Sequence, residues 1–266
     1  MLARSLLVLA AALSTSCFAV TDLDRFQKTE VSSSNFSDLR FSVRGMKSHV
    51  NELFEYRVID ASNVVQSRGL IVPLGGEDAS LFAKGAVPRQ NGPFRLDFYA
   101  DHDGVPGYDV TPKPNGDHAW RLPLDESLRT DDGTYVVSFD HNTSFQYLND
   151  PTPPREVGRP FVARLKNLAD YQNKRVEVRV ADASSGRVVA LYRVPSVKTP
   201  ELTLTVPGMI EQGVTYRIEL YTDDGFGTRA SIRAFRIERD GQEAGLDVTI
   251  DPTSPDVPRV EDVTPP

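Results

Sequence analysis

The chain has 266 residues, a length typical of about two domains. Hydrophobic residues make up 39% of it and charged residues 25%, which is sufficient for packed cores and argues against a disordered chain. The formal net charge is −7 and no long basic run is present, which argues against nucleic acid as a partner. The single cysteine excludes an intramolecular disulfide and a cysteine-based zinc site.

The N-terminal residues have the pattern of a secretory signal. Arg4 precedes an apolar run from Leu6 to Leu13, and small polar residues follow at 14–16. Such a short run cannot cross about 30 Å of hydrocarbon as a stable helix, so the pattern indicates export. No later stretch approaches about 20 apolar residues, and we therefore expect no transmembrane helix in the mature protein.

Two ways of processing this signal remain open. Ordinary signal peptidase would use the small residues of Cys17-Phe18-Ala19 and release a periplasmic or extracellular protein that begins at Val20. Alternatively, the segment from Leu13 to Cys17 resembles a bacterial lipobox, although its leucine lies four residues before the cysteine instead of three. This resemblance implies a lipoprotein whose contact with the membrane is a lipid anchor at Cys17.

Two segments of the chain recur at one offset of 122 positions: 57–62 (RVIDAS) as 179–184 (RVADAS), and 94–101 (FRLDFYAD) as 216–223 (YRIELYTD). Repetition at a fixed offset indicates an internal duplication. A third pair, AWRL at 119–122 and AFRI at 234–237, is 115 positions apart. The first copy therefore has seven extra residues between Asp101 and Trp120, and this insertion is the main asymmetry between the copies.

Alternating apolar residues predict half-buried strands. In the second copy Val176, Val178 and Val180 alternate with charged residues, and the same period of two recurs in the segments 202–206, 216–220 and 246–250. About seven short strands separated by Pro, Gly and Asp turns suit an immunoglobulin-like sandwich. We therefore predict an all-β protein with two tandem immunoglobulin-like β-sandwich domains.

The domain boundaries follow from composition. We expect a flexible tether before the first copy, a stiff linker between the copies and a disordered tail, because these segments are polar or rich in proline. The predicted division is a signal peptide at 1–19 (1–16 if Cys17 is lipidated), a tether at 20–37, a first sandwich with its inserted loop at 38–149, a linker at 150–160, a second sandwich at 161–250 and a tail at 251–266.

The inserted loop of the first copy contains residue types that bind metals. Calcium takes six to eight oxygen ligands, and carboxylates at alternating positions before a glycine can supply them. An EF-hand loop would need another oxygen and a glycine where this chain has Val105 and Pro106, so the spacing is incomplete. Turn formation on a solvated loop is the alternative. The candidate calcium ligands are Asp101, Asp103, Asp109 and Asp117.

The inserted loop also resembles a loop of a known group of proteins. Its pattern of Tyr99-Ala100-Asp101, Gly104 and Tyr108-Asp109 resembles an Asp- and Gly-rich hairpin loop of exported bacterial β-sandwich (immunoglobulin-like) proteins. The resemblance covers this loop alone. It implies an exported β-sandwich and no known activity.

All four histidines lie in the first copy: His49, His102, His118 and His141. If the inserted loop folds back, His102 and His118 meet at one end of the sandwich together with Asp101 or Asp117. Imidazole and carboxylate donors of this kind suit zinc or copper. The alternative is that the histidines are exposed or hydrogen-bonded without a metal.

Enzyme signatures are missing from the sequence, which has no Gly-x-Ser-x-Gly, His-Glu-x-x-His, P-loop or dinucleotide motif. Trp120, the only tryptophan, aligns with Phe235 and is expected in the core rather than on a sugar-binding surface. We therefore predict a non-enzymatic protein of the cell envelope or surface, a structural module or one that binds an envelope protein or glycan. The alternative is a metal-binding protein that uses the inserted loop to hold calcium, or zinc or copper.

Overall fold

The computed structural model describes residues 35–102, 116–143, 148, 153–223 and 232–260. Across these residues the regular structure is β-strand apart from three short 3-10 turns, so the predicted all-β fold class is confirmed. No helix in this part of the chain is long and apolar enough to cross a membrane. Residues 1–34, with the signal pattern and Cys17, lie outside the described residues.

Each half of the chain contributes a similar series of strands. The first half contains β1 (Phe36–Arg44), the turn η2 (Lys47–His49), β2 (Leu53–Ile59), β3 (Val65–Ile71), β4 (Ala79–Pro88), β5 (Phe94–Asp101), β6 (His118–Leu124), the turn η3 (Glu126–Leu128) and β7 (Tyr135–Asp140). The second half contains β8 (Arg159–Leu165), the turn η4 (Ala169–Tyr171), β9 (Val176–Asp182), β10 (Val188–Val194), β11 (Leu202–Ile210), β12 (Thr215–Asp223), β13 (Ile232–Asp240), β14 (Leu246–Ile250) and β15 (Arg259–Val260).

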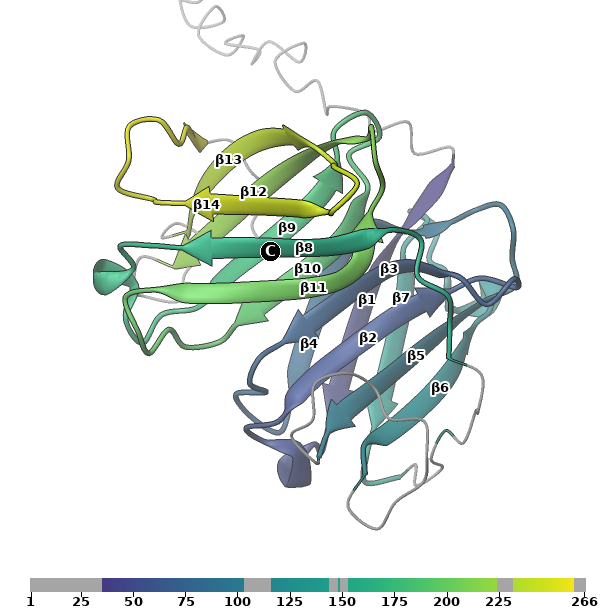
Figure 1. The fold of residues 1–266 in the computed structure, drawn as a ribbon. Coiled ribbons are helices and arrows are strands. Elements are labelled where there is room, and N and C mark those ends of the chain that lie inside the picture. Colours follow the sequence, from purple (N-terminus) through teal and green to yellow (C-terminus); the bar gives the residue numbers. More distant parts are fainter. Residues whose placement is uncertain (1–34, 103–115, 144–147, 149–152, 224–231, 261–266) are drawn as a thin grey trace, which may run out of the picture. The chain divides into compact units, whose positions relative to one another are not determined.

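The strands form one large sheet and two small ones (Figure 1). The small sheets have the orders β4-β1-β7 and β11-β8-β14. In each of them the central strand pairs antiparallel with the first neighbour and parallel with the second. The two small sheets therefore have the same strand arrangement.

The large sheet joins the two halves. It has nine strands in the order β15-β13-β12-β9-β10-β3-β2-β5-β6, and β10 pairs with β3 in parallel. The prediction of two separate sandwiches is therefore wrong in this respect. Since β3 and β10 would each be the edge strand of its own half, pairing them satisfies backbone groups that two separate sandwiches would leave open.

The two cores lie on opposite faces of the large sheet. Leu70 and the neighbouring Ile71 of β3 belong to different clusters, because successive residues of a strand point to opposite faces. In Figure 1 the sheet β11-β8-β14 lies in front of the large sheet and β4-β1-β7 lies behind it. Each core also contains residues of the other half: Ala181, Val188 and Leu191 in the first, and Ile59, Val65 and Leu70 in the second.

The described parts of the tether, linker and tail differ from the prediction. β1 begins at Phe36, inside the predicted tether. The backbone of Arg155 in the linker is hydrogen-bonded to Asn63 and Val65, so this part of the linker packs along β3. The tail forms β15, which pairs with β13 over residues 259–260. Backbone pairing orders the described parts of these segments, including the proline-rich linker and tail.

Each half also has buried charges on the sheet face that its small sheet leaves uncovered. Glu177 of β9 is 1% exposed and accepts hydrogen bonds from Arg179 at 2.7 Å and Arg193 at 2.6 Å. The matching Glu55 of β2 is more loosely paired: the Nε atoms of Arg68 and Arg57 lie 3.4 Å and 3.9 Å from its Oε1. Glu177 is therefore more tightly ion-paired than Glu55.

Candidate metal centre

One end of the first half contains all four histidines. His49 is the last residue of η2, which connects β1 to β2, and Glu52 follows three residues later. His102 comes directly after β5, and His118 begins β6. Since β5 and β6 pair antiparallel with Ala100 opposite His118, the sheet register brings these two histidines together. His141 follows β7 in the small sheet.

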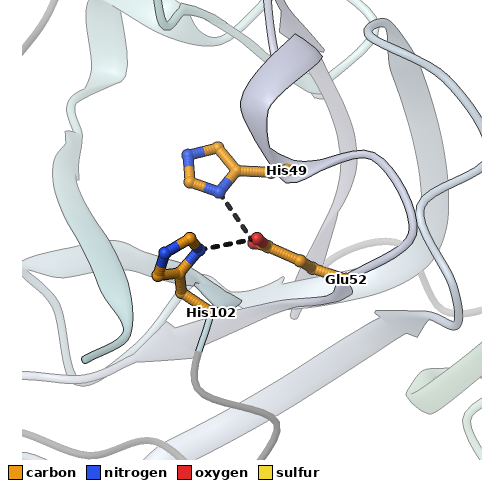
Figure 2. Close-up of side chains that lie close together, drawn as sticks. All are labelled: His49, Glu52 and His102. Atoms are coloured by element: carbon orange, nitrogen blue, oxygen red, sulfur yellow. Dashed lines mark hydrogen bonds and ion pairs between the residues drawn. The ribbon is translucent and has the colours of Figure 1, made fainter. Parts of the chain in front are cut away.

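Glu52 is hydrogen-bonded to two histidines, as Figure 2 shows. The Nδ1 atom of His49 lies 2.7 Å from Oε2 of Glu52, and the Nδ1 atom of His102 lies 2.8 Å from Oε1. A donor atom from each of these three residues lies within 4.8 Å of the other two. Among the described residues, these three side chains form a group that could hold a metal ion.

His118 and His141 extend this group. The Nδ1 atom of His118 lies 3.3 Å from Nε2 of His49, and its ring stacks on His102 with the centroids 5.1 Å apart. The ring of His141 lies 5.0 Å from that of His49. Trp120 packs beneath them, 5.6 Å from His49 and 5.5 Å from His141 between ring centroids. We refer to His49, Glu52, His102 and His118 as the histidine cluster.

The cluster is open to solvent on one side. The side chain of His49 is 0% exposed and that of Glu52 16%, whereas that of His102 is 38% exposed. Burial, reinforced by His49 and His102, lowers the pKa of His118. Burial and His49 likewise lower the pKa of His141. The lowered pKa favours the neutral form of both rings, and a neutral imidazole is the form that binds a metal ion.

The sequence identified two of the four residues of the cluster. His102 and His118 lie together at one end of the first half, and Asp117 lies beside them, accepting a hydrogen bond from the His102 amide at 3.3 Å. Asp101 belongs to β5 and is not part of the ligand group. Asp103 and Asp109, which are needed for the calcium arrangement, lie outside the described residues.

His49 and Glu52 were missed because they are about fifty residues from His102 in the chain. A signal for them exists in the internal repeat. It identifies 57–62 and 94–101 as strands of one copy, and the structure pairs them as β2 and β5. Residues just before the first of these strands lie beside residues just after the second, because the strands are antiparallel. Trp120 is 2% exposed, as expected for a core residue.

Comparisons with known proteins give no family for this chain. No protein-family model and no curated protein matches it. Among solved structures, it is similar to a mutant of the shaft pilin spaA from Lactobacillus rhamnosus GG, with 9% identity over 82% of this chain and 99% of that one and a TM-score of 0.22. It is also similar to a proposed cell adhesion protein from Parabacteroides distasonis, with 10% identity over 87% and 93% of the two chains and a TM-score of 0.22.

A third similar structure is the major pilin protein of Streptococcus pyogenes, with 8% identity over 82% of this chain and 97% of that one and a TM-score of 0.19. TM-scores this low establish no common fold with any of the three.

Proposed function

We propose that this chain is a non-enzymatic protein of the cell envelope or surface that binds one first-row transition-metal ion at the histidine cluster. The observation that supports the proposal is the meeting of donor atoms from His49, Glu52 and His102 within 4.8 Å of one another. Export rests on the signal pattern of the first residues. The structural role of the module, and an envelope protein or glycan as its partner, remain part of this proposal.

The donor set favours zinc or copper over calcium. Imidazole nitrogen suits Zn²⁺ and Cu²⁺, whereas Ca²⁺ takes six to eight oxygen atoms. Glu52 supplies the only carboxylate of the cluster, while its other three members supply ring nitrogens. The buried side chain of His49 also fixes one donor in place, because it cannot rotate into solvent.

Metal titration of the purified chain tests this function. We expect isothermal titration calorimetry to show one site for Zn²⁺ and Cu²⁺ and none for Ca²⁺. Cu²⁺ should also quench the fluorescence of Trp120, which is the only tryptophan and lies 5.6 Å from the His49 ring. The matched control is His49→Phe with His102→Asn. Equal binding by this control, or binding of Ca²⁺ alone, would overturn the proposal.

A lipid anchor at Cys17 is a separate proposal that rests on the lipobox-like segment from Leu13 to Cys17. If the cysteine is lipidated, the chain made in a bacterium partitions into detergent and the Cys17→Ser variant stays in water. A water-soluble unaltered chain that begins at Val20 would show that ordinary signal peptidase acts instead.

A further inference from the structure

The hydrogen bonds of Glu52 fix which ring nitrogens carry protons. A carboxylate only accepts hydrogen bonds, so the Nδ1 atoms of His49 and His102, at 2.7 Å and 2.8 Å, are the donors. In a neutral imidazole the other nitrogen then has a free electron pair. When the two rings are neutral, their Nε2 atoms are therefore the ones with metal-binding electron pairs, and the hydrogen bonds to Glu52 fix the orientation of both rings.

All three contacts within the cluster are hydrogen bonds, but only the longest of them also matches the spacing of two ligands on one metal ion. Two nitrogens bound to a tetrahedral Zn²⁺ at about 2.0–2.1 Å lie about 3.3 Å apart. The separation of His49 Nε2 and His118 Nδ1 is 3.3 Å. By contrast, the 2.7 Å between His49 Nδ1 and Glu52 would compress the angle at a shared metal to about 80°, far from tetrahedral.

We propose that the ion is bound by ring nitrogens alone, between His49 Nε2 and His118 Nδ1, with His102 as the third ligand. Glu52 then lies outside the coordination sphere as a positioning residue that orients His49 and His102. This inference rests on the proposed metal-binding function and specifies its ligands. Binding requires no net loss of a proton, because the proton on His118 Nδ1 moves to Nε2 by exchange with water.

The positions of the side chains agree with this division of roles. His49 is buried and is in contact with both Glu52 and His118 through its two different ring nitrogens. His102 is stacked on His118 at an interplanar angle of 17° and has the most exposed side chain of the three, so it can adjust its ring to complete the site. Carboxylates that orient metal-bound histidines in this way are common around protein metal ions.

Two variants distinguish a positioning role for Glu52 from a ligand role. In Glu52→Gln the site should keep one metal ion with affinity reduced about 10- to 100-fold, the usual effect of losing an orienting partner. The electron paramagnetic resonance spectrum of its Cu²⁺ form should show the same nitrogen coupling as the unaltered chain. In His118→Ala we expect a larger loss of affinity and a spectrum with one nitrogen fewer.

The opposite pattern would overturn the inference: loss of binding in Glu52→Gln, with His118→Ala binding as well as the unaltered chain. If the unaltered chain binds neither Zn²⁺ nor Cu²⁺, the proposed function fails instead. Circular dichroism of each metal-free variant checks folding. If His118→Ala does not fold, His118→Asn keeps a polar side chain and gives the same comparison.

Discussion

The turns η2 and η4 have the same place in the two halves, each between the central strand of a small sheet and a strand of the large sheet. η2 ends at His49 and η4 ends at Tyr171, 122 positions later. At the same offset Glu52 corresponds to Lys174, whose ammonium group lies 5.6 Å from the Tyr171 ring centroid. The shared scaffold therefore does not require a histidine or a carboxylate at these positions.

The difference extends to the large sheet. His118 corresponds to Arg233 and Trp120 to Phe235, at the offset of the third repeat segment. In the second half, cations thus stand in place of Glu52 and His118, and a tyrosine in place of His49. Since the same strand arrangement holds different residues at these positions in the two halves, the fold does not depend on the histidine cluster. The second half therefore serves as an internal control for the first.

The largest expected effect concerns whether the halves are independent. A fragment of residues 161–250 loses β3 as a partner and Ile59, Val65 and Leu70 from its core. Each such side chain contributes about 1.5–3 kcal/mol when buried, and a domain has only about 5–15 kcal/mol in total. We expect no cooperative thermal unfolding of the monomeric fragment by circular dichroism, whereas the full chain unfolds in one transition. A cooperative melt at the temperature of the full chain would show that the halves are separate domains.

The next effect concerns the cluster itself. Giving the first half the residues of the second, His49→Tyr with Glu52→Lys, removes a ligand and adds a positive charge. Affinity for Zn²⁺ should fall by much more than the ~100-fold typical of an outer-sphere change, and the metal-free melting temperature should fall as well, because the larger tyrosine replaces a fully buried histidine. Calorimetry and thermal melts measure both. The control is Tyr171→His with Lys174→Glu, which should create no site beside Phe235. Metal binding by the control would mean that the rest of the cluster is dispensable.

A smaller effect distinguishes the two buried ion-pair groups. Burial works to raise the pKa of Glu177, but Arg193 and Arg179 outweigh it and the pKa lies below its ordinary value. Glu177→Gln removes the carboxylate that accepts hydrogen bonds from two buried guanidinium groups, and we expect a loss of about 3–5 kcal/mol in the free energy of unfolding. Glu55→Gln should cost less, because its arginines are farther away. Urea unfolding of both variants tests the order, and an equal loss would contradict it.

The smallest effect is a pH dependence in the turn after β9. Burial works to raise the pKa of Asp182, but hydrogen bonds from the Ser184 hydroxyl and the amides of Ser184 and Ser185 lower it below its ordinary value. The native state therefore favours the ionised carboxylate. The resulting stability is present above pH 4, roughly the ordinary aspartate pKa, and is lost as the pH falls through the lowered one. Urea midpoints should fall less steeply with acid in Asp182→Asn, and an identical slope would count against this role.

The strands could be predicted from the sequence because their apolar residues alternate, as Val176, Val178 and Val180 do. The joined sheet could not. Parallel pairing of β3 with β10 depends on which sheet edges meet in three dimensions. The alternation of residues within a strand does not specify which other strand it pairs with. For this reason the sequence predicted two separate sandwiches, whereas the structure joins the halves in one sheet.

The site could be predicted in part for a related reason. His102 and His118 flank one insertion, so their proximity follows from a local feature of the chain. Their contact with His49 and Glu52 depends on the antiparallel register of β2 with β5. That register was available only once the strands were paired.

The parallel pairing of β3 with β10 also determines the order in which the chain can fold as it is synthesised. Arg68 of β3 pairs with Ala190 of β10, which is synthesised 122 residues later, so the two strands cannot pair until then. Until then the first half lacks Ala181, Val188 and Leu191 and exposes the edge of β3. Contacts so distant in sequence form slowly, and exposed edges are prone to aggregate. A nascent chain that is stopped before residue 194 should therefore need a chaperone to remain soluble.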